Sequence, residues 1–330
     1  MSNSSSSSAP KQEAPPLGKY LASTEKKTRD KAIKSLATFL SDESQKSMSP
    51  SERAKLWKGL FYSVCILGFW MSDKPLVQQD LSSELANLVL VIPSLESAIG
   101  FVHGFWEAMV REWAGIDRYR INKYYMLIRR FVNATFRLLL KHDWEREACG
   151  AINGILQGAG GPLCPDDKTV PASLSYHLAD IYLEELDKAL DTNDNDCEIP
   201  LMTLIDPFIH LSARTSNKIT FSRMQTALFT PLLDALVACA TPSADATDSQ
   251  RRKRKRPSET YPNLIESVCK PKTQAESATK PQGVARDVLK AVFDVAGHVD
   301  TKDTNRRKMY ALWRDRTEEI EGAPERDEVN

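Results

Sequence analysis

The chain has 330 residues, of which 42% are hydrophobic and 27% are charged, and its 44 Lys and Arg residues balance 44 Asp and Glu residues. This composition is typical of a soluble globular protein that is long enough for one large core or two domains. The zero net charge argues against a protein that coats nucleic acid with its whole surface, so any nucleic-acid contact must be local.

The first residues predict an intracellular chain without membrane segments. Residues 1–17 are rich in Ser and Pro, and we expect them to be disordered. They lack the apolar core of a signal peptide. The longest apolar run, Gly59 to Met71, is shorter than the roughly 20 residues that a membrane span needs. Six scattered cysteines form no C-x-x-C pair, which indicates reduced and mostly buried thiols.

A capping box opens the next segment of the chain. In "SPSERAKLWKGL", Ser49 is a candidate N-cap, Pro50 occupies the first helical position and Glu52 follows three residues after the cap. The aromatic-rich stretch that follows either fills the core or forms a protein-binding patch, and the core is at least as well supported for Trp57, Phe61 and Trp70. Polar residues around the "SDKP" turn are the better candidates for exposed contacts, namely Asp73, Lys74, Gln78, Gln79 and Asp80.

Helical periodicity continues as far as about residue 240. Apolar residues recur at steps of three and four in "LESAIGFVHGFWEAMVREW", in "DRYRINKYYMLIRRFVNATFRLLL" and in "ASLSYHLADIYLEELDKAL". Pro207 and Pro231 are predicted to kink or break later helices. No stretch alternates with period two between hairpin turns. The sequence therefore predicts an all-α fold of antiparallel helix pairs in a HEAT-like solenoid, with an irregular helical bundle as the alternative.

A basic stripe is predicted in the helix from Asp117 to Lys141. Cations in this segment outnumber acids, and Lys123, Arg130, Arg137 and Lys141 share one helical face. The opposite face is apolar, with Tyr124, Leu127, Ile128, Phe131 and Leu138. The stripe can contact RNA phosphates or an acidic partner, and the alternative is a solvated face paired with neighbouring acids. The candidate contact residues are Arg118, Arg120, Lys123, Arg130, Arg137 and Lys141.

A second basic feature lies in a polar segment after residue 240. "RRKRKR" is a candidate nuclear localisation signal or nucleic-acid-binding tail, and a solvated linker is the alternative. Its residues are Arg251, Arg252, Lys253, Arg254, Lys255 and Arg256. The predicted organisation is a disordered tail (1–17), a helical-repeat domain (18–240), a basic flexible linker (241–282), a helical segment that docks on the body or on a partner (283–322) and a disordered tail (323–330).

No motif predicts catalysis, and we expect no catalytic residue, metal, cofactor or small-molecule substrate. His103, Glu107 and Arg111 at steps of four predict a helical ion-pair ladder, because no third ligand completes a metal pattern. Gly158, Gly160 and Gly161 follow a helix rather than a strand and predict a helix stop and a loop.

The segments "KYLASTEKKTRDKAIKSLATFLS", "KLWKGLFY", "WMSDKPLVQQDLSSELA" and "FVHGFWEAMVREWAGIDRYRINKYYMLIRRFVNATFRLL" resemble the eukaryotic ribosomal-RNA-processing protein 1 family. The resemblance covers roughly residues 17–235. One departure is "SVCILGF" (Ser63 to Phe69), which separates "KGLFY" from "WMSDKP" and is either a lengthened helix or an artefact of the gene model. The resemblance implies a nucleolar, non-enzymatic assembly factor. Its partners would be pre-ribosomal particles of the large subunit, other assembly factors and precursor rRNA. A nuclear adaptor or transport protein without RNA binding is the alternative.

Overall fold

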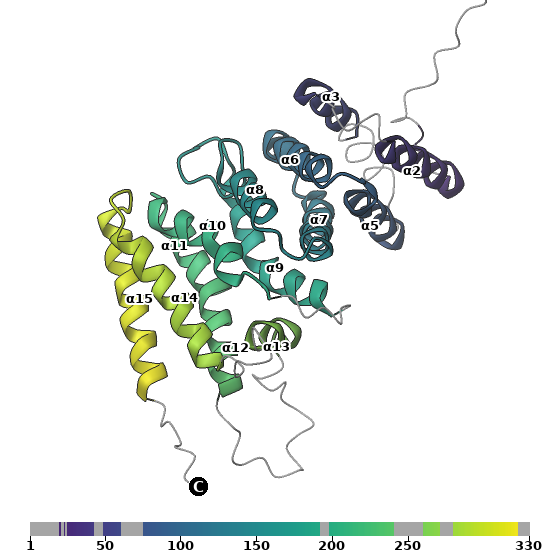
Figure 1. The fold of residues 1–330 in the computed structure, drawn as a ribbon. Helices are drawn as coiled ribbons and strands as arrows, with labels where there is room; N and C mark the ends of the chain where they lie inside the picture. Colours follow the sequence, from purple (N-terminus) through teal and green to yellow (C-terminus); the bar gives the residue numbers. More distant parts are fainter. Residues whose placement is uncertain are drawn as a thin grey trace, which may run out of the picture.

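The computed structural model describes residues 20, 23, 25–42, 49–60, 75–191, 198–240, 260–270 and 280–322, and these residues form helices and turns without a strand. The all-α prediction is confirmed (Figure 1). The α-helices are α2 (Lys26–Ser41), α3 (Pro50–Leu60), α5 (Pro75–Val91), α6 (Leu95–Glu112), α7 (Ile121–Lys141), α8 (Arg146–Gln157), α9 (Ala172–Leu190), α10 (Leu201–Arg214), α11 (Lys218–Met224), α12 (Thr230–Ala240), α13 (Pro262–Cys269), α14 (Pro281–Gly297) and α15 (Asp303–Gly322). A short 3-10 helix, Trp113–Gly115, follows α6, and a π-helical turn, Gln225–Phe229, joins α11 to α12.

The helices alternate between two layers. One layer consists of α2, α5, α7 and α9, each packed against the next, and the other consists of α3, α6, α8 and α10 in the same order (Figure 1). Along the chain, each helix of one layer is followed by a helix of the other as far as α10. This arrangement is the stacked helix-pair architecture of HEAT-like solenoids, as the sequence predicted.

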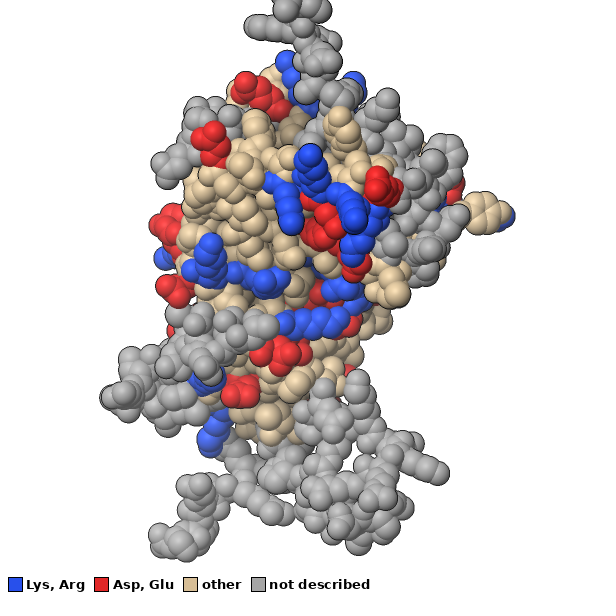
Figure 2. All heavy atoms as spheres, turned by 90° about the vertical axis from the view of Figure 1, so that its right-hand side faces the viewer, with Lys and Arg blue, Asp and Glu red and all other residues tan. Residues whose placement is uncertain are grey.

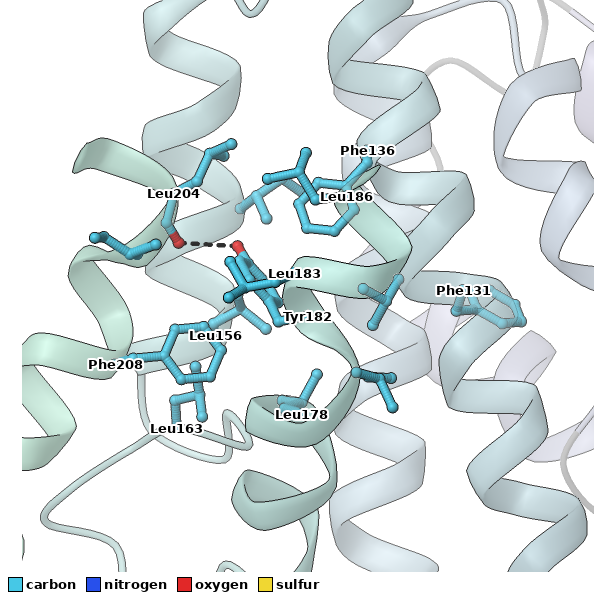
Figure 3. Close-up of a cluster of buried hydrophobic side chains, with 14 of the residues drawn as sticks. Phe131, Phe136, Leu156, Leu163, Leu178, Tyr182, Leu183, Leu186, Leu204 and Phe208 are labelled. Carbon is cyan, nitrogen blue, oxygen red and sulfur yellow. Dashed lines mark hydrogen bonds between the residues drawn. The ribbon is translucent and has the colours of Figure 1, made fainter. Parts of the chain in front are cut away.

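Aromatic and leucine side chains from both layers fill the space between them. Figure 3 shows Tyr182 of α9 between Phe136 of α7 and Phe208 of α10. The buried Tyr182 hydroxyl donates a hydrogen bond of 2.9 Å to the carbonyl oxygen of Leu204. Burial raises the pKa of Tyr182. A buried tyrosine thus packs its ring in the core and satisfies its polar end on a neighbouring helix.

The N-terminal helix pair is anchored by Trp57. Its ring lies 4.6 Å from that of Phe101 and 5.7 Å from that of Phe105, measured between centroids, and only 6% of the residue is exposed. The Trp57 ring passes so close to Gly104 that a Cβ atom there would lie 2.1 Å from its Cδ1 atom. Trp57 is therefore a core residue, whereas Phe61, Trp70 and the segment 63–69 lie outside the described residues.

Of the two predicted effects of the prolines, a kink or a break, a break does not occur, because neither Pro207 nor Pro231 ends its helix. α10 continues through Pro207. In its first turn, the carbonyl oxygens of Thr203 and Leu204 accept hydrogen bonds from the side chains of Asn153 and Tyr182. Pro231 lies in the first turn of α12, directly after the π-helical turn. Pro231 has no N–H to donate to a helical hydrogen bond. The π-helical turn before it contains one extra residue, which changes the pairing of backbone donors and acceptors at this point.

The C-terminal helices pack on the body of the same chain. α13 packs against α9, α14 against α10 and α12, and α15 against α14. The Asn305 side chain donates to the carbonyl oxygens of Ala213 and Thr215 at the end of α10. α13 lies within the segment 241–282 that was expected to be a flexible linker. It is ordered because Leu264 and Ile265 are buried and because the Asp187 carboxylate accepts a hydrogen bond from the Leu264 N–H.

Several local predictions are also resolved by the structure. The Ser49–Glu52 capping box forms, with the Ser49 N–H donating to the Glu52 carboxylate over 2.8 Å. α8 ends at Gln157, and Gly160 adopts a positive φ of 76° in the loop that follows. The four described thiols are free, but only Cys149 is buried, while Cys164 and Cys269 are half-buried and Cys239 is exposed. The expectation of mostly buried cysteines is therefore wrong for the described residues. No helix in the described part of the chain is long and apolar enough to cross a membrane.

Candidate nucleic-acid interface

α7 is an inner helix of its layer and lies between α5 and α9. Its predicted apolar face is buried at Tyr124, Leu127, Ile128, Phe131 and Leu138, which confirms the assignment of the two faces. The helix begins at Ile121 rather than at Asp117. Residues 117–120 form a turn because the Asp117 carboxylate accepts hydrogen bonds from the backbone N–H groups of Tyr119 and Arg120, at 2.9 and 3.0 Å.

Two of the cations in this segment are committed to ion pairs. Arg120 binds Asp117 through its guanidinium group. Arg129 Nη1 lies 2.7 Å from Glu184 and 2.8 Å from Glu185 of α9, and Lys188 binds the same two acids. Partial burial alone would lower the pKa of Arg129, but these two carboxylates raise it. The sequence left open whether these cations contact a partner or pair with neighbouring acids. The structure shows that Arg120 and Arg129 pair with neighbouring acids.

Three other cations of α7 have no carboxylate partner among the described residues: Arg130, Arg137 and Lys141. The Nε atom of Arg130 is buried and forms no hydrogen bond within the described part. Arg137 is exposed, and its one partner among the described residues is the amide oxygen of Asn87 on α5, to which it donates over 3.2 Å. Lys141 is exposed at the C-terminal end of α7. Lys123 is half-buried and has an interaction of its own, so it is not an uncommitted cation.

Charge alternates from helix to helix across this layer. α2 carries five cations and one acid, α5 two acids and no cation, α7 five cations and no acid, and α9 four acids and one lysine. Ion pairs join neighbouring helices, as between Lys26 and Asp80 at 3.6 Å. Figure 2 views this side of the molecule and shows blue and red side chains interleaved. The face is therefore not uniformly basic, and the uncommitted charge of α7 is local.

The candidate contacts near the "SDKP" turn are only partly exposed. Gln79 and Asp80 are exposed on α5, and Asp80 is the residue paired with Lys26. Gln78 is buried, which corrects its prediction as an exposed contact. It lies three residues before Leu81 on the same helical turn, so its side chain is on the side of α5 that packs inward. Asp73, Lys74 and the run from Arg251 to Arg256 lie outside the described residues.

Sequence reasoning missed two features of this layer. Tyr119, in the turn before α7, is 76% exposed, and the Arg118 guanidinium carbon lies 4.8 Å from its ring centroid. The signal in the sequence was its position between two arginines, Arg118 and Arg120. The other feature is an exposed row of lysines on α2, namely Lys27, Lys31 and Lys34. Their spacing of four and three residues places them on one face.

Ion pairs also form between described residues outside this layer. His103 lies 3.8 Å from Glu107, as the predicted ladder requires, but Arg111 binds the adjacent Glu112 instead of Glu107. Within the described residues, no three His, Cys, Asp or Glu side chains are grouped closely enough to hold a metal ion.

Comparisons with known proteins agree on one family. The family model described as nucleolar protein Nop52 matches residues 12–313. The chain is 34% identical to the human protein named ribosomal RNA processing protein 1 homolog B over 221 residues, which cover 65% of this chain and 27% of that protein. It is 32% identical to mouse homolog A, with 66% and 43% covered, and 27% identical to human homolog A, with 90% and 69% covered.

The chain thus spans less than half the length of the first two of these relatives. The match to the family model nevertheless extends over most of the chain, from the segment before α2 into α15. This range includes both layers of the solenoid and the turn before α7. The protein belongs to the Nop52 family of nucleolar proteins, whose relatives here are named ribosomal RNA processing protein 1 homologs.

Proposed function

We propose that this protein acts in ribosomal RNA processing as a non-enzymatic scaffold in the assembly of the large ribosomal subunit. The names of its relatives, each a ribosomal RNA processing protein 1 homolog, support the process. The description of its family as nucleolar supports a location in the nucleolus. The two-layered solenoid supports the scaffold role, because stacked helix pairs offer extended surfaces to several partners at once.

The RNA-binding part of this proposal rests on the three cations of α7 that have no described carboxylate partner. Arg130, Arg137 and Lys141 share one face of α7, on which Arg137 and Lys141 are exposed and Arg130 is half-buried, and no described carboxylate neutralises them. Such cations bind phosphate by releasing the counterions that surround a nucleic acid. Their local placement on a neutral protein is suited to one segment of precursor RNA, while the rest of the surface remains available to other assembly factors.

The test is crosslinking with sequencing in cells, in which an Arg137→Glu/Lys141→Glu variant replaces the wild-type protein. Both side chains are exposed, so the variant should fold. The matched control is Lys290→Glu/Arg307→Glu, which makes the same charge change on exposed residues of α14 and α15. We expect crosslinks to large-subunit precursor RNA to be lost in the first variant and retained in the control.

A second outcome would favour the rival function, a nuclear adaptor that does not bind RNA. Such a protein would not sediment with pre-ribosomal particles, and its removal would leave precursor RNA processing normal. Crosslinks that persist in the α7 variant would instead place the RNA contact elsewhere. The segment Arg251–Arg256 is then the next candidate, and we propose that it also serves in nuclear import.

A further inference from the structure

An exposed aromatic side chain lies at the start of the α7 row of cations. Tyr119 is 76% exposed, the highest value among the aromatic residues that the structure describes, and Phe39 follows at 44%. A tyrosine in that position contributes little to the core, since burial of its ring is what makes an aromatic residue stabilising. Its ring is therefore accessible to a ligand.

The turn holds this side chain in a defined arrangement. Arg118 lies over the Tyr119 ring, and its Nη2 atom also donates to the tyrosine hydroxyl over 2.6 Å. The Asp117 carboxylate fixes the turn through the backbone N–H groups of Tyr119 and Arg120. Slight burial opposes ionisation of Asp117, but the hydrogen bonds from Arg120 and Tyr119 lower its pKa. A side chain fixed in this way loses less conformational freedom when it binds a ligand.

The surroundings of Tyr119 favour a nucleic acid over an apolar protein surface. Its neighbours in sequence are Arg118 and Arg120, and α7 then continues to the uncommitted cations Arg130, Arg137 and Lys141. A helix of 21 residues is about 30 Å long, so the row extends over several nucleotides. An exposed ring beside a row of cations is the combination by which proteins bind single strands, with bases stacked on the aromatic face and phosphates along the cations.

We propose that Arg118 and Tyr119 form a base-stacking site for single-stranded RNA, and that the RNA backbone continues from this site along the outer side of α7. The inference deepens the proposed function and rests on it. Duplex RNA is excluded as the ligand of the stacking site, because the faces of its bases are already stacked on one another. The cation over one side of the Tyr119 ring leaves the opposite side for a base.

The experiment measures binding of the purified full chain to a fluorescein-labelled oligouridylate of about twelve nucleotides by anisotropy, over a series of salt concentrations. We expect Tyr119→Ala to weaken binding about 5- to 150-fold, with an unchanged salt dependence. Tyr119→Trp should bind at least as well as the wild type. Arg137→Glu/Lys141→Glu should weaken binding and also reduce its salt dependence, since fewer counterions are released.

Phe39→Ala is the matched control, because it removes another exposed aromatic ring that lies on α2, and it should bind like the wild type. Wild-type affinity in Tyr119→Ala would overturn the stacking site, while a loss in the α7 charge variant would leave the proposed phosphate contact standing. Unchanged binding in both variants would overturn both proposals. An equal loss of affinity for a duplex in Tyr119→Ala would also overturn the stacking site, because a duplex offers no base to stack.

Discussion

The side-chain amide of Asn153 on α8 donates a hydrogen bond of 2.6 Å to the carbonyl oxygen of Thr203 on α10. In a regular helix this oxygen would accept from the N–H of the residue four positions later, which here is Pro207 and has none. Asn153 therefore replaces the missing donor, and the same bond joins two neighbouring helices of one layer. The buried Tyr182 hydroxyl donates a hydrogen bond to the next carbonyl group, that of Leu204, and so joins α9 to α10.

We predict that Asn153→Ala lowers the free energy of unfolding by about 1–3 kcal/mol, because the Thr203 carbonyl is left without a donor. Pro207→Ala restores an N–H in α10, so the double variant Asn153→Ala/Pro207→Ala should lose less stability than the two single changes added together. Urea unfolding of the four proteins gives this coupling energy directly. Additive losses would show that Asn153 does not substitute for the helical donor.

Gly104 is predicted to be required for the packing of α3 on α6. In Gly104→Ala the new Cβ would overlap the Trp57 ring, and we expect a loss of about 1–3 kcal/mol. Gly150→Ala is the matched control, because that helical glycine has no atom within 4 Å of the added Cβ and the change should stabilise the protein by about 0.5–1 kcal/mol. Equal melting temperatures of the two variants would contradict the close contact seen here.

The ion-pair network between α7 and α9 is predicted to be sensitive to loss of its arginine. Glu185 is 1% exposed, and its Oε2 atom has no hydrogen-bond partner among the described residues. Arg129→Met should destabilise the protein by about 3 kcal/mol, the lower end for a buried pair, because Lys188 still binds Glu185. The double change Arg129→Met/Glu185→Leu should recover most of this loss, since it removes the buried charge together with its partner.

A histidine on α10 is predicted to contribute a pH-dependent increment of stability. The hydrogen bond to Asp206, with His210 Nε2 3.4 Å from Oδ1, raises the pKa of His210 above its usual 6.5, although partial burial opposes the shift. A pKa that is higher in the folded state makes this stabilisation fully present below about pH 6.5. It is lost as the pH rises through the folded-state pKa.

The measurement is urea unfolding of the wild type and of His210→Asn at several pH values between about 5.5 and 8.5. The difference in unfolding free energy between them should be largest at the acidic end and shrink toward the alkaline end. Its size should stay below about 1 kcal/mol, because both side chains are partly exposed. A constant difference over this range would show that the pair does not couple protonation to folding.

α7 has features that could be predicted from the sequence and features that could not. Its apolar face followed from helical spacing alone, because residues three and four apart share a face whatever surrounds the helix. The partners of its cations did not follow, since Arg129 meets Glu184 and Glu185 only after α9 packs alongside it, more than fifty residues later in the chain. The burial of Gln78 was missed because a polar residue was assumed to face solvent.

The sequence by itself determined the helical character of the segment up to about residue 240, the capping box at Ser49, the loop at Gly160 and the resemblance to a family. Each of these depends on short-range chemistry or on the order of the residues. Only the tertiary structure decided that α13 is ordered, that Pro207 lies within an unbroken helix and that Arg130, Arg137 and Lys141 have no carboxylate partner among the described residues. These outcomes depend on which side chains distant segments bring together. A donor such as Asn153, or an acid such as Asp187, has its effect only where the packed layers place it.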